Sequence, residues 1–278
     1  MNKTKIEYLT HTWNPLAMRC TPVSKGCANC WHLRMADRLA KNPKMPEFKR
    51  NIYAGGYKAE MVAWNHPMGR KQPAVIGVQF MGDIAHESVE GLDFYLVFDM
   101  MAMCQQHTFV VLTKRPKRMA ELLHHFRGDR LLLDNIWLGV TVEDQETADE
   151  RIPQLLQIPA AHYWASYEPA LESTVFDDTW LCSCMDCGNK GSSAIFGNHP
   201  GSGLDLCRAC KGEEGPSIEF VVAGGESGPG ARPAHPDWFR SVRDQCAAAG
   251  VPFFMKQMAR REPIPDDLMV RQLPWEMP

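Results

Sequence analysis

The sequence lacks a long apolar run and lacks a strong net charge of either sign. No stretch reaches the roughly 18 apolar residues of a transmembrane helix, and the positively charged residues 1–7 are not followed by the apolar segment of a signal peptide. Lys and Arg number 30 against 33 Asp and Glu, so the formal net charge of −3 gives no overall field that attracts nucleic acid or a membrane. We therefore expect a cytoplasmic protein with no membrane partner, on which any basic surface is local.

Disulfides are not expected either, although the chain has ten cysteines. The cytoplasm keeps thiols reduced, so cysteines gathered at short spacing favour metal binding there. Eight of the ten lie in two groups, within residues 20–30 and 182–210. Cys104 and Cys246 stand apart on helix-like segments, which predicts buried core thiols.

Short apolar runs alternate with helix-like segments along most of the chain. The runs predict seven strands at residues 8–13, 74–81, 108–113, 135–142, 162–167, 218–223 and 251–255. Helices are predicted at residues 28–41, 92–106, 116–126, 145–156 and 236–249. This alternation is typical of parallel βαβ units, so the predicted fold is α/β, a partial or complete TIM-like (β/α) barrel.

One segment interrupts this pattern. Residues 182–215 are rich in Gly, Ser, Asn and Cys, which predicts an inserted zinc-ribbon-like module within a barrel made of residues 1–181 and 216–278. Two CxxC pairs separated by nineteen residues have the spacing of a structural zinc site with four thiolates. The predicted ligands are Cys184, Cys187, Cys207 and Cys210, with Cys182 as a substitute for Cys184 and an iron site as the alternative.

The first group has three cysteines, Cys20, Cys27 and Cys30. A closed zinc site needs four ligands, whereas three thiolates can hold an iron–sulfur cluster that keeps one iron open. Cys27 and Cys30 stand at the start of a predicted helix, where the dipole stabilises thiolates. The alternatives are a zinc site completed by His32 or another distant residue, and unligated thiols.

Ionisable residues follow nearly every predicted strand. The carboxyl ends of parallel strands meet at one face of a barrel, where active sites are built. The acidic candidates for polar groups of a cofactor or substrate are Asp83, Glu143, Glu168 and Glu226. Gly224 and Gly225 would let the backbone approach a ligand, and the cationic candidates for a phosphate or carboxylate substrate are Lys114, Arg115, Arg232 and Lys256. For each residue, a structural ion pair is the alternative.

Several motifs together resemble a known family. They are the CxxxxxxCxxC of the first cysteine group with the preceding residues 12–15, and the segments 80–83, 112–116, 137–143, 166–169, 222–233 and 253–257. In this order they resemble a phage-associated family of unknown function, the three-cysteine-motif proteins related to radical SAM enzymes. The resemblance covers nearly the whole chain apart from residues 182–215.

The resemblance implies a [4Fe–4S] cluster on the three cysteines, with S-adenosylmethionine on the open iron and an electron donor as partner. Reductive cleavage of S-adenosylmethionine would then give a 5′-deoxyadenosyl radical. Radical SAM loops usually have three residues between the first two cysteines and a GGE motif after the second strand. Here six residues separate Cys20 from Cys27, and the GGE follows the sixth strand. Either Asp83 takes over the amino-group role, or the cluster binds a ligand other than S-adenosylmethionine.

Three functions remain open at this point. The first is a radical SAM-like enzyme that acts on a nucleic acid or nucleotide in repair or modification. The second is an iron–sulfur DNA repair or redox protein that does not use S-adenosylmethionine. The third is a non-enzymatic, zinc-stabilised nucleic-acid-binding protein.

Overall fold

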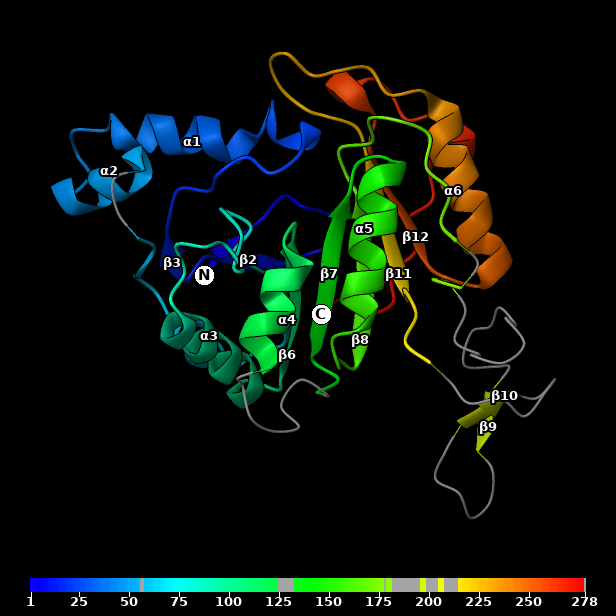
Figure 1. Cartoon of the computed structure of the whole chain (residues 1–278), viewed down its shortest axis with the longest axis horizontal. Helices are drawn as coiled ribbons and strands as arrows, with labels where there is room; N and C mark the ends of the chain where they lie inside the picture. Colours follow the sequence, from blue (N-terminus) through cyan, green and yellow to red (C-terminus); the bar gives the residue numbers. More distant parts are fainter. Residues whose placement is uncertain are drawn as a thin grey trace. The chain divides into compact units, whose positions relative to one another are not determined.

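The computed structural model describes residues 1–55, 58–124, 133–177, 179–181, 196–198, 205–207 and 215–277 (Figure 1). It divides into two compact units. The first comprises residues 1–140, 158–162 and 276–278, and the second residues 141–157 and 163–275. Among the described residues, no helix is long and apolar enough to cross a membrane.

The first unit is built on a mostly parallel sheet. Its strand order is β1 (Asn2–Lys3), β2 (His11–Trp13), β5 (Ala74–Val78), β6 (His107–Thr113) and β7 (Ile136–Val142), and only the β1–β2 pair is antiparallel. Every residue of β5 and β7 is buried, as expected of strands covered on both faces. Helices α3 (Gly91–Met103) and α4 (Pro116–His124) form the connections that parallel strands require.

The segment between β2 and β5 forms a smaller layer in the same unit. Helices α1 (Trp31–Ala40) and α2 (Glu47–Ala54) pack against each other (Figure 1), and α2 ends at Gly55 with a left-handed φ of 92°. The short strands β3 (Leu16–Ala17) and β4 (Glu60–Met61) pair in antiparallel fashion. The 3-10 turns η1 (Lys25–Cys27) and η2 (His66–Gly69) complete this layer.

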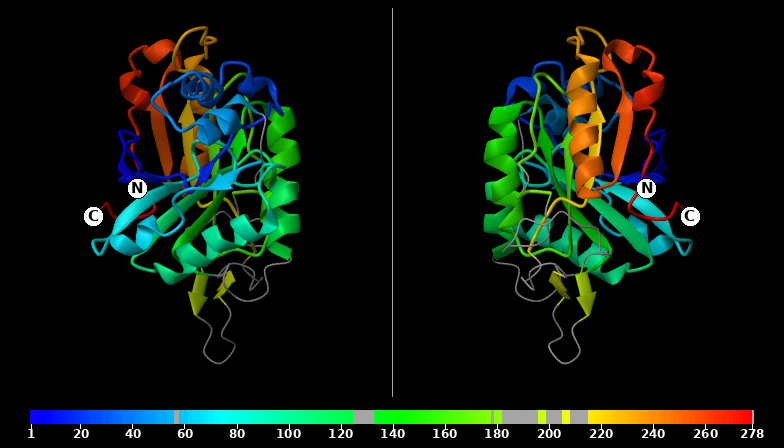
Figure 2. Two further views of the ribbon diagram at one scale, coloured as in Figure 1. Left: turned by 90° about the vertical axis from the view of Figure 1, so that its left-hand side faces the viewer. Right: turned by 90° about the vertical axis from the view of Figure 1, so that its right-hand side faces the viewer.

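The second unit has the parallel strand order β8 (His162–Tyr167), β11 (Phe220–Gly224) and β12 (Phe253–Gln257). Figure 2 shows α6 (Pro236–Ala249) running alongside β11 and β12, with which it is in contact. Helix α5 (Gln145–Leu156) begins with a capping box between Asp144 and Thr147. The short strands β9 (Phe196–Asn198) and β10 (Asp205–Cys207) form a separate antiparallel pair, and the turns η4 (Ala259–Arg261) and η5 (Asp266–Leu268) follow β12.

These elements confirm the predicted α/β class. All seven predicted strands and all five predicted helices are present, with residues 125–126 of one helix outside the described part. The first helix begins at Trp31 and not at Ala28, because η1 forms a tight turn and Cys30 has a non-helical ψ of 123°. The closure of the sheet into a barrel is not shown and stays a prediction. The division at residues 182–215 also stays a prediction, because most of that segment lies outside the described residues.

A buried glutamine directly follows β5. Gln79 has a left-handed φ of 52°, which turns the chain away from the sheet. Its side-chain oxygen accepts from the amide of Leu16 at 3.0 Å, and its side-chain nitrogen donates to the carbonyls of Leu16 at 3.1 Å and Met81 at 3.0 Å. The amide of Met81 in turn donates to the side-chain oxygen of Asn14 at 2.8 Å. Two carboxamides therefore hold the loop that leads to Asp83.

Candidate functional site

Asp83 is buried at the end of this loop, and each of its two carboxylate oxygens accepts two hydrogen bonds. Oδ1 accepts from the hydroxyl of Thr113 at 2.7 Å and from the amide of Ala85 at 3.0 Å. Oδ2 accepts from the amide of Lys114 at 2.9 Å and from Nη1 of Arg115 at 3.1 Å. Four donors match the capacity of a carboxylate. Asp83 therefore joins the ends of β5 and β6 and positions Arg115.

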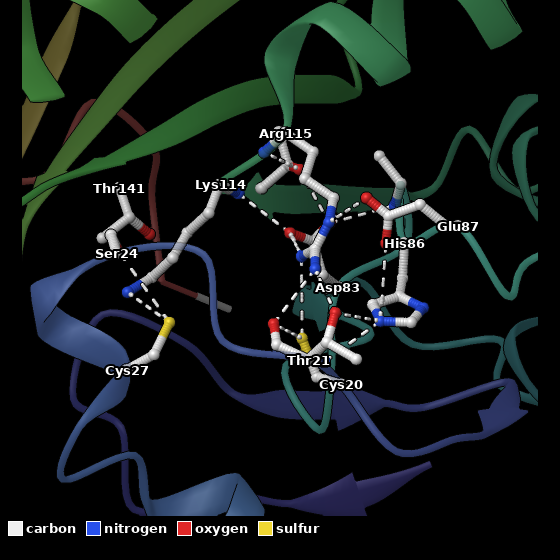
Figure 3. A network of polar contacts seen from close by, with 12 residues as sticks. Cys20, Thr21, Ser24, Cys27, Asp83, His86, Glu87, Lys114, Arg115 and Thr141 are labelled. Carbon is white, nitrogen blue, oxygen red and sulfur yellow. Dashed lines mark hydrogen bonds and ion pairs between the residues drawn. The ribbon is translucent and has the colours of Figure 1, made fainter. Parts of the chain in front are cut away.

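The guanidinium of Arg115 links this acid to the cysteine loop (Figure 3). Its Nη1 lies 3.6 Å from Sγ of Cys20, and its Nη2 donates to the carbonyl and the hydroxyl of Thr21, both at 3.0 Å. Its Nε donates to the carboxylate of Glu87 at 3.0 Å. A planar group with five donors can make such a set of contacts, whereas a lysine at this place could not.

The next cation reaches a second thiol. Nζ of Lys114 lies 3.7 Å from Sγ of Cys27, and the hydroxyl of Ser24 lies 3.7 Å from the same sulfur (Figure 3). Burial acts to raise the pKa of Cys27, but the Lys114 ammonium and hydrogen bonds with Val23 and Ser24 outweigh it and lower the pKa below its ordinary value. This thiol is therefore the more acidic of the two.

Cys20 has the opposite balance. Burial, with the charge of Asp83 adding to it, raises the pKa of the Cys20 thiol to about 11, although Arg115 acts in the other direction. Cys30 stands just before α1, and its amide donates to the carbonyl of Cys27 at 3.2 Å. Burial lowers the pKa of His32 to about 4, so this imidazole is neutral and its Nε2 accepts from the amide of Cys20 at 3.3 Å.

The cysteine segment fits an iron–sulfur cluster in its donor chemistry. It supplies soft thiol ligands, and two of them lie beside cations that would offset the negative charge of a cluster. Within the described part of the chain, however, no three His, Cys, Asp or Glu side chains are arranged as a metal-binding group. In the alternative zinc site, His32 would be a ligand, but its Nε2 already accepts a hydrogen bond from the amide of Cys20.

The predicted residues of the second unit are brought together in pairs. Lys256 places its Nζ 2.7 and 2.8 Å from the two carboxylate oxygens of Glu168. Arg232 donates from its amide at 2.8 Å and from its Nε at 3.1 Å to Glu226. For these four residues the structure contains the ion pairs that the sequence left open as an alternative.

Glu143 has a partner that the sequence did not indicate. It is fully buried, and its Oε1 lies 3.5 Å from Nη1 of Arg151 on α5. Arg151 also donates to the carbonyl of Thr141 at 2.8 Å, so it ties α5 to the end of β7. The position of Arg151 eight residues after Glu143, two turns into the next helix, is the signal that could have predicted this pair.

The two glycines of this unit have different neighbours. A methyl group on Gly224 would lie 3.5 Å from the Glu168 carboxylate and the Gln257 side chain, at ordinary contact distance. A methyl group on Gly225 would lie 2.4 Å from the amide nitrogen of Ala259, so the backbone there would have to shift to accept it. The space beside Gly225 is therefore filled by the protein's own backbone, where the sequence predicted room for a ligand.

The predicted zinc ligands lie mostly beyond the described residues. Cys182, Cys184, Cys187 and Cys210 belong to undescribed parts of the chain, and Cys207 is described only as the last residue of β10, opposite Phe196. The zinc site therefore stays a prediction. In the first unit, sequence reasoning missed Thr21 and Glu87, whose closeness to Cys20 and Asp83 along the chain was the available signal.

A comparison with protein families gives a match that covers most of the chain. The model of a family described as a protein of unknown function, DUF5131, matches residues 3–267. No curated protein and no solved structure matches the chain.

Proposed function

Because the chain belongs to the DUF5131 family, whose function is unknown, we propose a function from the site itself: a radical SAM-like iron–sulfur enzyme that acts on a nucleic acid or nucleotide. The observation that carries this proposal is the contact of two neighbouring cations with two thiols. Lys114 and Arg115 follow β6 directly and lie 3.7 and 3.6 Å from the sulfurs of Cys27 and Cys20.

The charges of the site support a cysteine-bound cluster. Hydrogen bonds to sulfur and nearby charges set the reduction potential of an iron–sulfur cluster. Lys114 and Arg115, which directly follow β6, place both kinds of group beside the thiols. When bound, a cluster of this type supplies an electron to a ligand on its open iron. Cys20, Cys27 and Cys30 would hold it, and Lys114 and Arg115 would stabilise its negative charge.

Asp83 has a positioning role in this proposal. The resemblance implied that it holds the amino group of S-adenosylmethionine, but its four hydrogen bonds occupy both oxygens. Asp83 therefore aims Arg115 at Cys20 and Thr21. The electron donor and S-adenosylmethionine remain part of the proposal through the resemblance, and zinc through the two CxxC pairs.

Elemental analysis of anaerobically purified and reconstituted protein tests the cluster. We expect iron and sulfide, and their loss from each of the variants Cys20→Ala, Cys27→Ala and Cys30→Ala. Cys104→Ala is the matched control, because this buried thiol stands apart from the site and should leave the iron content unchanged. Iron that persists in all three site variants would refute the assignment of the ligands.

Reduction with dithionite in the presence of S-adenosylmethionine tests the chemistry. The proposal expects 5′-deoxyadenosine and methionine above the Cys30→Ala background. A cluster whose electron paramagnetic spectrum ignores S-adenosylmethionine, with no such products, would favour the iron–sulfur protein that does not use this cofactor. Two zinc ions and no iron would favour the non-enzymatic nucleic-acid-binding protein.

A further inference from the structure

The near-neutral net charge hides a basic segment in the first unit. Residues 19–71 contain eleven Lys or Arg and three Asp or Glu, a formal charge of +8. The rest of the chain contains nineteen Lys or Arg and thirty Asp or Glu, a formal charge of −11. This segment includes the cysteine loop, α1 and α2, so the positive charge is concentrated on one layer of the unit.

The exposed face of α1 carries a stripe of one aromatic residue and three cations. Trp31, Arg34, Arg38 and Lys41 follow one another at intervals of three, four and three residues, so they lie along one side of the helix. All four are exposed, with Trp31 at 52%, whereas His32 and Ala36 form the buried side. Trp31 directly follows Cys30, so the stripe begins at the cysteine segment.

Two arginines of this stripe have described contacts within α1 and the turn before it. Arg34 donates to the carbonyl of Asn29, and Arg38 lies 3.3 Å from the sulfur of Met35, and both of these acceptors are neutral. Asp37, the acid of α1, pairs with Arg19 at 2.7 Å. Because Arg34, Arg38 and Lys41 are all exposed, the stripe presents cationic side chains to the solvent.

A second exposed aromatic residue lies on α2, which packs against α1 (Figures 1 and 2). Phe48 is 50% exposed, and Nζ of Lys49 lies 5.9 Å from the centre of its ring. Lys44, in the connection between the two helices, is also exposed. Exposed rings interleaved with cations are the pattern that single-stranded nucleic acids select, because phosphates pair with the cations and unpaired bases stack on the rings.

We propose that the exposed face of α1, with the adjoining surface of α2, binds single-stranded nucleic acid and leads it to the cysteine segment. Arg34, Arg38 and Lys41 contact phosphates, and Trp31 stacks on an unpaired base beside Cys30. The choice of a single strand follows from the exposed rings, since a duplex offers phosphates but keeps its bases stacked. This inference rests on the proposed function for its substrate class and adds the surface that recognises the substrate.

Fluorescence anisotropy with a labelled oligothymidylate, measured against salt concentration on the full-length protein, tests this surface. Replacement of the three cations, Arg34→Glu/Arg38→Glu/Lys41→Glu, should abolish detectable binding at physiological salt. The neutral variant Arg34→Gln/Arg38→Gln/Lys41→Gln should weaken binding and flatten the slope of log K against log salt by about 2, because each lost phosphate contact on a single strand removes about 0.7.

A matched control has the same change of charge elsewhere on the first unit. Lys3→Glu/Lys5→Glu/Lys117→Glu replaces three exposed lysines outside residues 19–71. It should bind the oligonucleotide at close to the parent affinity. Equal losses in the two glutamate variants would overturn the proposal, since binding would then report net charge alone.

The role of Trp31 has its own test. Trp31→Ala should weaken binding of the single strand roughly five- to one-hundred-fold, the loss of one stacked base, and leave the weaker duplex binding unchanged. Trp64→Ala, an exposed tryptophan outside α1 and α2, is the control and should change neither. Equal effects on single strand and duplex would overturn the stacking assignment, and anionic lipid vesicles bound as tightly as the oligonucleotide would overturn the choice of ligand.

The outcome can be separated from that of the proposed function. Cys30→Ala should lose iron but keep oligonucleotide binding, because the stripe does not depend on the cluster. Oligonucleotide binding by a protein that never takes up iron supports the surface and refutes the enzyme. A protein that binds the cluster but shows no difference between the stripe variants and their controls refutes the surface.

Discussion

Each unit has an acidic side chain paired with a cation at the ends of its strands, but the two cations differ in their other contacts. In the first unit, Arg115 satisfies Asp83 and still reaches the sulfur of Cys20. In the second unit, Lys256 gives both of its described contacts to Glu168, across the intervening strand β11. The difference teaches that an acid and a cation at adjacent strand ends do not by themselves mark a functional site. The first unit differs because its cation, Arg115, also contacts a third group, the thiol of Cys20.

Among these tests, replacement of Arg115 should cause the largest loss of stability. Both side chains of the Asp83–Arg115 pair are only 6% exposed, so Arg115→Met leaves a buried carboxylate without its cation. We expect this to lower the free energy of unfolding by about 3–5 kcal/mol, measured by urea denaturation of the metal-free protein. Lys256→Met breaks a pair that is 22% and 18% exposed and should cost only about 1–2 kcal/mol. Similar costs would remove the distinction between the two pairs.

The acidities of the two thiols sharpen the same comparison. The pKa of Cys27 lies below its ordinary value and that of Cys20 is about 11, so at pH 8 the thiolate fraction of Cys27 should be roughly 100-fold or more higher. The pH dependence of alkylation in the metal-free protein, followed by mass spectrometry of the two peptides, measures this. Lys114→Met should move the Cys27 midpoint to higher pH, and Lys117→Met should leave it in place. An unmoved midpoint in Lys114→Met would contradict the role given to this lysine.

Two adjacent glycines test whether backbone fills the space at this strand end of the second unit. Gly225→Ala forces a methyl group against the backbone of Ala259 and should lower the free energy of unfolding by about 1–3 kcal/mol. Gly224→Ala meets its neighbours at ordinary contact distance and should cost less than about 1 kcal/mol. Chemical denaturation of both variants measures the difference. Equal costs would show that Ala259 can move aside.

The smallest loss of stability is expected from breaking a network of exposed ion pairs in the second unit. Asp267 lies 2.8 Å from Arg240 and 3.1 Å from Arg243, and these arginines lower its pKa to about 2. Its stabilising contribution is therefore present above the unfolded pKa near 4 and is lost as the pH falls through 2. Thermal melts of Asp267→Asn should show a slight loss at pH 7 that high salt removes. A loss comparable to that of Arg115→Met would mean that exposed and buried pairs are equivalent here.

The strands were predictable from the sequence because burial on both faces leaves a continuous apolar run. Residues 74–78 and 136–142 are fully buried and show no competing pattern. Helix α2 and the strands β3 and β4 were not predicted, because they are short and are stabilised by tertiary contacts that no local pattern records. The class of the fold was therefore accessible, and the layer between β2 and β5 was not.

The site was predictable in its members and not in its pairings. The structure brings the strand-end residues Asp83 and Arg115 into contact, but their predicted binding roles stay predictions. Nothing local in the sequence indicates that four donors occupy the carboxylate of Asp83. The basic face of α1 was missed for a different reason. The net charge of −3 is the sum of +8 in this segment and −11 in the rest of the chain, so the composition of the whole chain conceals the feature.

The carboxamides of Gln79 and Asn14 have one more consequence. They hold the loop that ends at Asp83, and neither of them gains or loses a proton in the physiological range. A change of pH can therefore alter the ionisation of the thiols while the carboxylate that organises them keeps its place. Replacing the nitrogen of Gln79 by oxygen, as deamidation does, would remove two donors at once and bring a charge into the support of the loop.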